Sequence, residues 1–342
     1  MPRCFRRRGF FVDAGGTLFR HGAVVLPDYW SLLSLVLPVF AVIAAGAGAR
    51  RAGWLKPEAD ESLLKLVVNF LYPCLIFQHV LGNDALRTPG NLIAAPLLAF
   101  VMMVGGILLA YVVAKWAGFE RGSGLRTFAF SVGIFNYGYM AIPLVAELFG
   151  REMPGVLGVL FVFNVGCEAA IWTVGILMLS GVSLREGWRR VLNPPVYALV
   201  AAVTLNLTGM AEWLPEVARQ AIQMAAACAV PLGLLLIGAT LVEFFNAPRS
   251  LVDRKVTPLA CALRLGVIPL GMLGLAAVLP LPPELRAVVI VQAAMPAGIL
   301  PIVIARHHGG RPLTAVQVVL GTTAVGLFIV PLWLKLGLGW LR

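Results

Sequence analysis

Residues 131–143 interrupt an apolar stretch that is otherwise long enough to cross a membrane as one helix. This segment, SVGIFNYGYMAIP, contains two glycines, an asparagine and a proline. Glycine and proline weaken a helix, and proline also removes a backbone hydrogen-bond donor. Backbone groups freed in this way cannot face lipid, so they must meet protein or a water-filled cavity. The sequence therefore predicts a broken helix at membrane depth.

A second apolar stretch is interrupted in the same way in the C-terminal half. It runs from Gln292 to Pro301 with the sequence QAAMPAGILP, and Pro301 corresponds to Pro143 of the first break. Two breaks at corresponding places in the two halves of a membrane chain indicate a transport site. The alternative is that proline and glycine only kink each helix, since prolines are common in membrane helices.

The composition places the chain among integral membrane proteins. Of its 342 residues 60% are hydrophobic and 13% are charged, against about 25% charged in globular domains. The net charge of +11 comes from basic residues scattered between apolar stretches, so we expect no nucleic-acid partner. The five cysteines lack metal-ligand or disulfide spacing, and we expect no metal or cofactor. The sequence contains neither a phosphate-binding glycine loop nor an HExxH motif, so we expect no enzymatic activity.

The apolar stretches predict ten spans, each near the ~20 residues that cross the hydrocarbon core. They cover residues 31–49, 63–81, 92–114, 126–149, 154–180, 194–210, 217–243, 258–279, 285–305 and 312–340. Connectors after odd-numbered spans carry 14 Lys and Arg and the others carry 4, which places the odd ones in the cytoplasm. Every aspartate falls outside these spans.

We predict an all-α polytopic fold of two inverted five-helix repeats, in which the broken fourth and ninth helices cross. The first repeat is 31–180 and the second is 194–342, joined by a short cytoplasmic connector at 181–193. Residues 1–30 form an arginine-rich extension without the apolar core of a signal peptide. This extension is either a disordered arm or an upstream start assigned in error.

The substrate-binding residues are predicted where the two breaks cross. Half-helix N-termini present unpaired N–H groups and positive dipole ends, which suit a carboxylate or another anion. The amide of Asn136 can donate to an anion or accept from a cation. The predicted binding set is Asn136, Tyr137, Gly138, Pro143, Gln292, Met295, Pro296, Gly298 and Pro301.

Glu168 is the only acidic residue near the middle of a predicted span. An ionisable group at membrane depth is a functional candidate, and burial that disfavours its charged form would let it bind and release a proton. The alternative is a neutral acid bonded to a carbonyl group of an adjacent helix. Asn164 lies one turn earlier on the same helix face, and Asn69 is predicted to support the cavity.

Arg264 lies about two turns inside the eighth predicted span. Its guanidinium could pair with a substrate carboxylate or with Glu168. The alternative is that the side chain extends to the cytoplasmic surface, as long basic side chains near span ends do.

With these residues in view, the chain resembles the auxin efflux carrier family, specifically its bacterial members. The resemblance covers residues 31–341. It rests on the motifs LPVF at 37–40, NFLYP at 69–73, NYG at 136–138 before Pro143, PL at 231–232 before Gly238, and MPA at 295–297 before Pro301.

This resemblance implies a scaffold domain of spans 1, 2, 6 and 7 and a transport domain of spans 3–5 and 8–10. It also implies an elevator-type movement around a proline crossover, an organic-anion substrate and a place in the bacterial inner membrane. Asn136 and the two proline breaks map to the substrate site. Bacterial members are associated with malonate or malate, whereas auxin is typical of plant members, whose long cytoplasmic loop is reduced here to 181–193.

We therefore expect a secondary active or facilitative transporter of a small organic anion in the lipid bilayer. A proton or sodium ion is the candidate coupling ion, and a homodimer is the candidate assembly. One alternative is a sodium/proton antiporter of similar fold, which usually needs aspartates inside the spans. Another is a non-transporting membrane receptor for a small acid, although two aligned breaks suit alternating access better than static binding.

Overall fold

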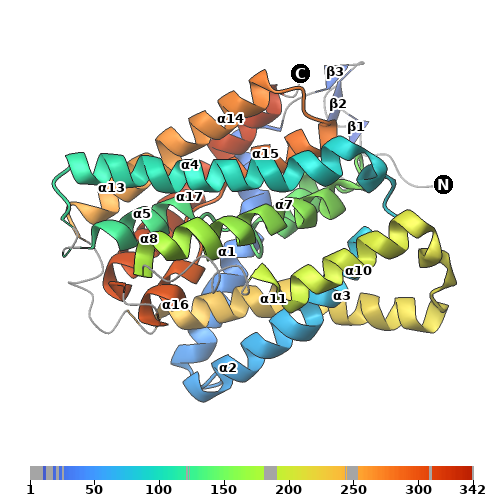
Figure 1. Cartoon of the computed structure of the whole chain (residues 1–342), viewed down its shortest axis with the longest axis horizontal. Helices are drawn as coiled ribbons and strands as arrows, with labels where there is room; N and C mark the ends of the chain where they lie inside the picture. The colour runs from blue at the N-terminus through green and yellow to red at the C-terminus, as the bar shows by residue number, and fades with distance from the viewer. Residues whose placement is uncertain are drawn as a thin grey trace.

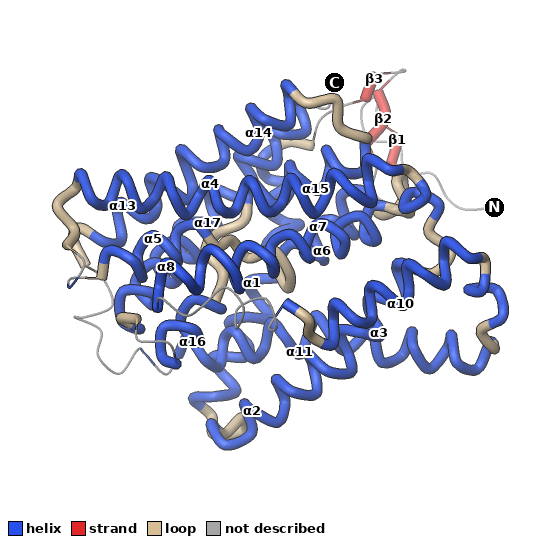
Figure 2. The backbone as a smooth tube through the Cα atoms, in the orientation of Figure 1, coloured by secondary structure: helices blue, strands red, loops and turns tan. Residues whose placement is uncertain are grey.

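The computed structural model describes residues 27–120, 122, 124–180, 191–242, 244, 253–307 and 310–340, together with three short N-terminal strands. The strands β1 (Phe11–Val12), β2 (Leu18–Arg20) and β3 (Ala23–Val24) form an antiparallel sheet in that order. The rest is almost entirely helical (Figures 1 and 2). Most of the predicted N-terminal extension and of the connector 181–193 lies outside the described residues.

Helices occupy all ten predicted ranges. In chain order they are α1 (Tyr29–Arg51), α2 (Pro57–Leu66), α3 (Tyr72–Val80), α4 (Ala95–Trp116), α5 (Leu125–Gly133), α6 (Ala141–Phe149), α7 (Val156–Ala170), α8 (Ile176–Ser180), α10 (Pro194–Thr208), α11 (Glu216–Val242), α13 (Val256–Ala262), α14 (Ile268–Val278), α15 (Pro283–Ala294), α16 (Leu300–His307) and α17 (Pro312–Trp340). Wide π turns lie at Val67–Leu71, Gly90–Ala94, Ile171–Gly175 and Leu263–Val267, and 3-10 turns at Asp84–Arg87 and Met210–Trp213.

Seven continuous helical segments of the described chain are long and apolar enough to cross a membrane. They are Tyr29–Arg51, Pro57–Val80, Gly90–Trp116, Val156–Leu179, Glu216–Val242, Val256–Val278 and Pro312–Trp340. Of the other three predicted spans, α10 is shorter, and the α5–α6 and α15–α16 segments are interrupted. The interruptions fall where glycine and proline gather in the sequence, as predicted.

Several helices begin at a residue that caps their free backbone N–H groups. The Asn193 side chain accepts from the N–H of Val196 at 3.1 Å, and prolines follow in the first turn of α10, where a missing N–H costs little. The Asp253 carboxylate accepts from the N–H groups of Val256 and Lys255 at 2.8 Å before α13. These backbone donors hold the pKa of Asp253 below its usual value.

The helices form two bundles, which Figure 1 shows one above the other. The lower bundle contains α2, α3, α10 and α11, with α1 packed against α11; the upper bundle contains α4, α5, α7, α13 to α15 and α17. Helix α16 lies lower in this view and packs against α5 and α17. By these contacts spans 1, 2, 6 and 7 group together and spans 3–5 and 8–10 group together, while their roles as scaffold and transport domains stay predictions. Contacts of α1 with α17 and of α3 with α7 join the bundles.

Two glycines bring α1 and α11 into backbone contact. A Cβ atom added at Gly46 would lie 2.0 Å from the carbonyl oxygen of Leu235. A Cβ atom added at Gly238 would lie 1.8 Å from the carbonyl oxygen of Ile43. Small residues allow this close approach between membrane helices, so α1 and α11 are held together as one rigid pair.

Candidate functional site

Both predicted breaks are present. Residues 134–140 between α5 and α6, and residues 295–299 between α15 and α16, are not helical. These two segments, which we call the crossover, lie against each other in the middle of the molecule. Their contact brings together two parts of the chain that are far apart in sequence.

The two segments of the crossover satisfy each other's backbone groups. The N–H of Asn136 donates to the carbonyl oxygen of Pro296, and the N–H of Gly298 donates to that of Ile134, both at 2.9 Å. These bonds form an isolated antiparallel β-bridge. A Cβ atom at residue 298 would lie 3.0 Å from the carbonyl oxygen of Phe135, so this close approach favours glycine. The two breaks thus pair backbone groups that each would otherwise leave free.

The prolines of the two breaks restart the helices. Pro143 and Pro301 lie in the first turns of α6 and α16, where a missing N–H leaves no bond unmade. Neither proline lines the cavity described next. Their contribution is to end each gap at a fixed residue.

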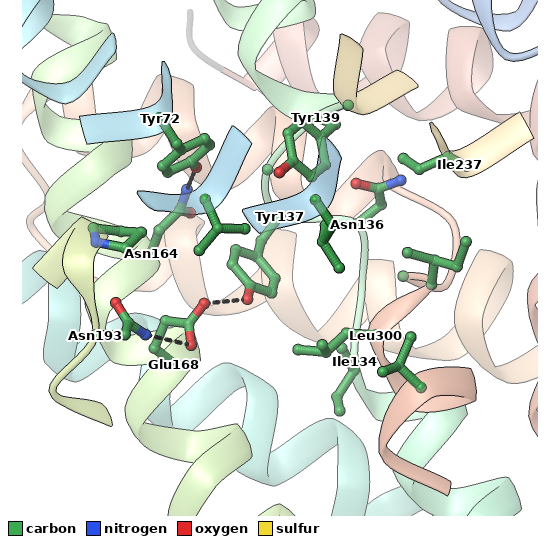
Figure 3. Close-up of a pocket in the computed structure, with 18 of the residues that line it drawn as sticks. Tyr72, Ile134, Asn136, Tyr137, Tyr139, Asn164, Glu168, Asn193, Ile237 and Leu300 are labelled. Carbon is green, nitrogen blue, oxygen red and sulfur yellow. Dashed lines mark hydrogen bonds between the residues drawn. The ribbon is translucent and has the colours of Figure 1, made fainter. Parts of the chain in front are cut away.

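A cavity of about 410 Å³ lies between the crossover and the lower bundle (Figure 3). Four residues of the predicted binding set line it: Asn136, Tyr137, Gly138 and Gly298. Its other walls come from α2, α3, α7, α10, α11 and α16 and are mostly apolar. Among the described residues that line it, none is Lys, Arg or His. The described residues also contain no cluster of three His, Cys, Asp or Glu that could hold a metal ion.

The amide of Asn136 belongs to the cavity wall (Figure 3). Its Oδ1 accepts a long hydrogen bond of 3.5 Å from the N–H of Met140, near the start of α6. This bond directs the oxygen toward the helix terminus, so the NH₂ group is the part of the amide that can donate to a ligand.

Three side chains hydrogen-bond to Glu168 at the cavity wall, and Figure 3 draws two of these bonds, to Tyr137 and Asn193. Its Oε1 accepts from the hydroxyl of Tyr137 at 2.5 Å, and its Oε2 accepts from Trp172 Nε1 at 2.8 Å and from Asn193 Nδ2 at 3.4 Å. The predicted bond to a carbonyl group of an adjacent helix does not match these contacts, because all three partners are side chains.

Buried amides connect Glu168's helix to the crossover. Gln292 Nε2 donates to the carbonyl oxygen of Tyr137 at 3.0 Å and to Asn164 Oδ1 at 3.4 Å. Asn164 Nδ2 in turn donates to the hydroxyl of Tyr72 at 3.5 Å. Gln292 is fully buried behind the cavity, whereas Asn164 lines it. Gln292 therefore supports the site from behind.

Arg264 is fully buried and does not line the cavity. Its guanidinium donates to three carbonyl oxygens at the C-terminal end of α15, at 3.0–3.4 Å, including that of Met295. It also lies over the ring of Phe135, 5.1 Å from the ring centre. The prediction that Arg264 pairs with Glu168 and the alternative that its side chain extends to the cytoplasmic surface are therefore both wrong.

Asn69 is exposed and does not line the cavity, contrary to the predicted supporting role. The α2–α3 segment turns a stripe of every fourth residue toward the cavity: Asp60, Leu64, Val68, Tyr72 and Ile76. Asn69 lies one position off this stripe, which rotates it about 100° around the helix axis.

Asp60 corrects a second expectation. The sequence prediction placed every aspartate outside the spans, but α2 continues into the second span and Asp60 lines the cavity. Its carboxylate is hydrogen-bonded to Arg50 of α1.

Three further cavity residues were absent from the predicted set: Tyr72, Trp172 and Asn193. The Asn-Pro-Pro cap at 193–195 is the one sequence signal that could have drawn attention to Asn193.

Comparisons with known proteins agree with this arrangement. The profile of a protein family described as membrane transport protein matches residues 31–186 and 182–334, and each stretch contains one segment of the crossover. An uncharacterized transporter of Methanothermobacter thermautotrophicus is 28% identical over 305 residues, which cover 87% of this chain and 96% of the relative. Auxin efflux carrier component 8 of Arabidopsis thaliana is 22% identical over 346 aligned positions, which cover 83% of this chain and 91% of the relative.

Proposed function

Because the chain belongs to the auxin efflux carrier family of membrane transport proteins, we propose that it is a secondary active or facilitative carrier of a small organic anion. It is an integral multi-pass membrane protein and a transporter. The observation that carries the proposal is the cavity at the crossover, which is walled by both bundles and contains the amide of Asn136.

The proposed substrate is a mono- or dicarboxylate such as malonate or malate. The cavity supplies side-chain donors suited to a carboxylate, the amide of Asn136 and the hydroxyl of Tyr139. Auxin, which the name of the Arabidopsis relative contains, is a second candidate. The aromatic lining, including Tyr72, Tyr139, Phe161 and Trp172, favours a substrate with an apolar ring.

The proposed mechanism is an elevator-type movement of the upper bundle, which carries the crossover, against the lower bundle. It is supported by the rigid α1–α11 pair and by the bonds that tie the crossover to α7 and α15. We extend the proposal to ten spans in two inverted repeats, in which α10 and the two interrupted segments also cross the bilayer. Proton or sodium coupling, a homodimer and a bacterial inner-membrane location stay predictions.

A sodium/proton antiporter is the less favoured alternative. Exchange of ions needs carboxylates that are free to bind and release them. The two carboxylates that line the described cavity, Asp60 and Glu168, are instead held by Arg50 and by three uncharged donors. Substrate-free, sodium-dependent proton flux in proteoliposomes would favour the antiporter. Ligand binding without flux would favour a receptor.

The test is uptake of labelled malonate, malate and indole-3-acetate into proteoliposomes, together with thermal stabilisation by each compound. A ligand at about 100 times its Kd stabilises the folded protein by about 2.7 kcal/mol. We expect Asn136→Ala to abolish both effects. Asn69→Ala is the matched control, because it removes the same amide from an exposed position away from the cavity. Equal ligand responses in both variants would remove the crossover from the binding site.

A further inference from the structure

The position of Arg264 is not accounted for by the proposed binding set. It is the largest fully buried side chain among the described residues, and it lies at the π turn between α13 and α14. Its guanidinium contacts both segments of the crossover, through the carbonyl oxygen of Met295 in one and the ring of Phe135 in the other. One charged group therefore holds the two breaks together from behind the cavity.

This guanidinium carries a positive charge without a carboxylate to neutralise it. In the described part of the chain its partners are three carbonyl oxygens, a methionine sulfur and an aromatic ring. Each of these groups carries only a partial negative charge. The carbonyl oxygens lie at the C-terminal end of α15, which is the negative end of the helix dipole. Its Nη1 has no hydrogen-bond partner among the described residues. A buried charge is costly to keep, so partial compensation leaves a positive field at the crossover.

The cavity lies on the other side of the same residues. Phe135 contacts Arg264 and also lines the cavity, so one residue connects the charge to the cavity wall. No Lys, Arg or His is among the described residues of the cavity wall. An electric field crosses a low-dielectric protein layer with little screening, and a preorganised charge acts without moving.

We propose that Arg264 supplies the positive charge with which the crossover cavity holds an anion, acting through Phe135 and the crossover without touching the ligand. This inference rests on the proposed anion-carrier function. Arg264 is accordingly a positioning and electrostatic residue. It gives the site affinity for negative charge while the cavity wall itself stays free of long basic side chains, which would fill the space.

The experiment measures the affinity of the purified full chain for two probes of similar shape. Malonate is a dianion, and monomethyl malonate is a monoanion. In Arg264→Gln we expect an affinity loss on the order of tenfold for the monoanion and roughly the square of that factor for malonate, because Coulomb energy scales with ligand charge. Arg264→Lys should keep most of the preference for malonate, because it keeps the charge. Lys255→Gln should change neither affinity, since Lys255 also lies over a phenylalanine ring but on the surface.

Equal losses for both probes in Arg264→Gln would assign the residue a purely structural role and overturn the inference. If Arg264→Gln does not fold, Arg264→Lys decides the question: a changed preference between the probes, with the charge present, would also overturn it. Failure of the unmodified protein to bind either probe would instead refute the small-carboxylate function, and the assignment of Arg264 with it. Binding that is unaffected in Arg264→Gln leaves the function standing and refutes only the role of Arg264.

Discussion

The hydrogen bond between Tyr137 and Glu168 joins the crossover to α7, and its strength can be measured by a double-mutant cycle. The bond is 2.5 Å long, partly buried and made to a carboxylate. Bonds of this kind contribute about 1.5–3 kcal/mol. Tyr137→Phe removes the donor with little change in ring volume, and Glu168→Met removes both acceptor oxygens in an unbranched side chain of similar length. We expect a coupling free energy of about 1.5–3 kcal/mol between the two substitutions.

The assay is unfolding of the purified single and double variants in mixed detergent micelles. The matched control replaces Tyr137→Phe with Tyr139→Phe, because Tyr139 lines the same cavity but has no hydrogen bond to Glu168. This control cycle should be additive within about 0.5 kcal/mol. An equally small coupling for Tyr137 and Glu168 would refute the reasoning, because it would show that the observed geometry contributes no net stability.

Three further predictions concern packing and capping. Gly238→Ala should destabilise the protein by about 1–3 kcal/mol through overpacking against α1, whereas Gly48→Ala, which meets no atom within 4 Å, should not; thermal unfolding distinguishes them. Gly233→Ala would place a Cβ atom 2.3 Å from the ring of Tyr139, which must then move within the cavity wall, so we expect slower transport, and an unchanged transport rate would contradict this. Asp253→Ala should cost about 1 kcal/mol at neutral pH by loss of a helix cap. Because the folded state lowers the pKa of Asp253, its stabilisation is present above the unfolded pKa and is lost as the pH falls through the folded value, so the two proteins should converge in acid; a constant difference would refute the capping role.

The sequence predicted the helices and the breaks because both depend on local chemistry. Long apolar stretches define the helices, and the glycine and proline residues of 134–140 and 295–299 define the gaps. Asn136 was correctly placed beside the crossing, because it belongs to the gap itself. The side chains that face the cavity were harder to identify, since a rotation of one residue moves a group from the cavity to the outer surface, as at Asn69.

The partners of the two charged candidates could not be predicted for a different reason. Arg264 binds backbone carbonyl groups, which have no residue type to recognise. Glu168 binds Asn193 from another helix and Trp172 from within the π turn at Ile171–Gly175. Such turns shift the phase of all following side chains, and no clear sequence signal marks them. Sequence periodicity alone therefore assigns residues to spans but does not assign their contacts.

The crossover also has a consequence for how the protein is made. Ile134 and Asn136 find backbone partners at Gly298 and Pro296, and the bond from Gln292 to Tyr137 joins groups 155 residues apart in the chain. During synthesis the first half enters the membrane before these partners exist. Until the second half is made, the N–H and carbonyl groups of the first broken helix stay unpaired, which is costly in lipid. We therefore expect the newly made N-terminal half to depend on water or on the insertion machinery until the second break arrives, and truncation before residue 296 to yield a product that the cell degrades.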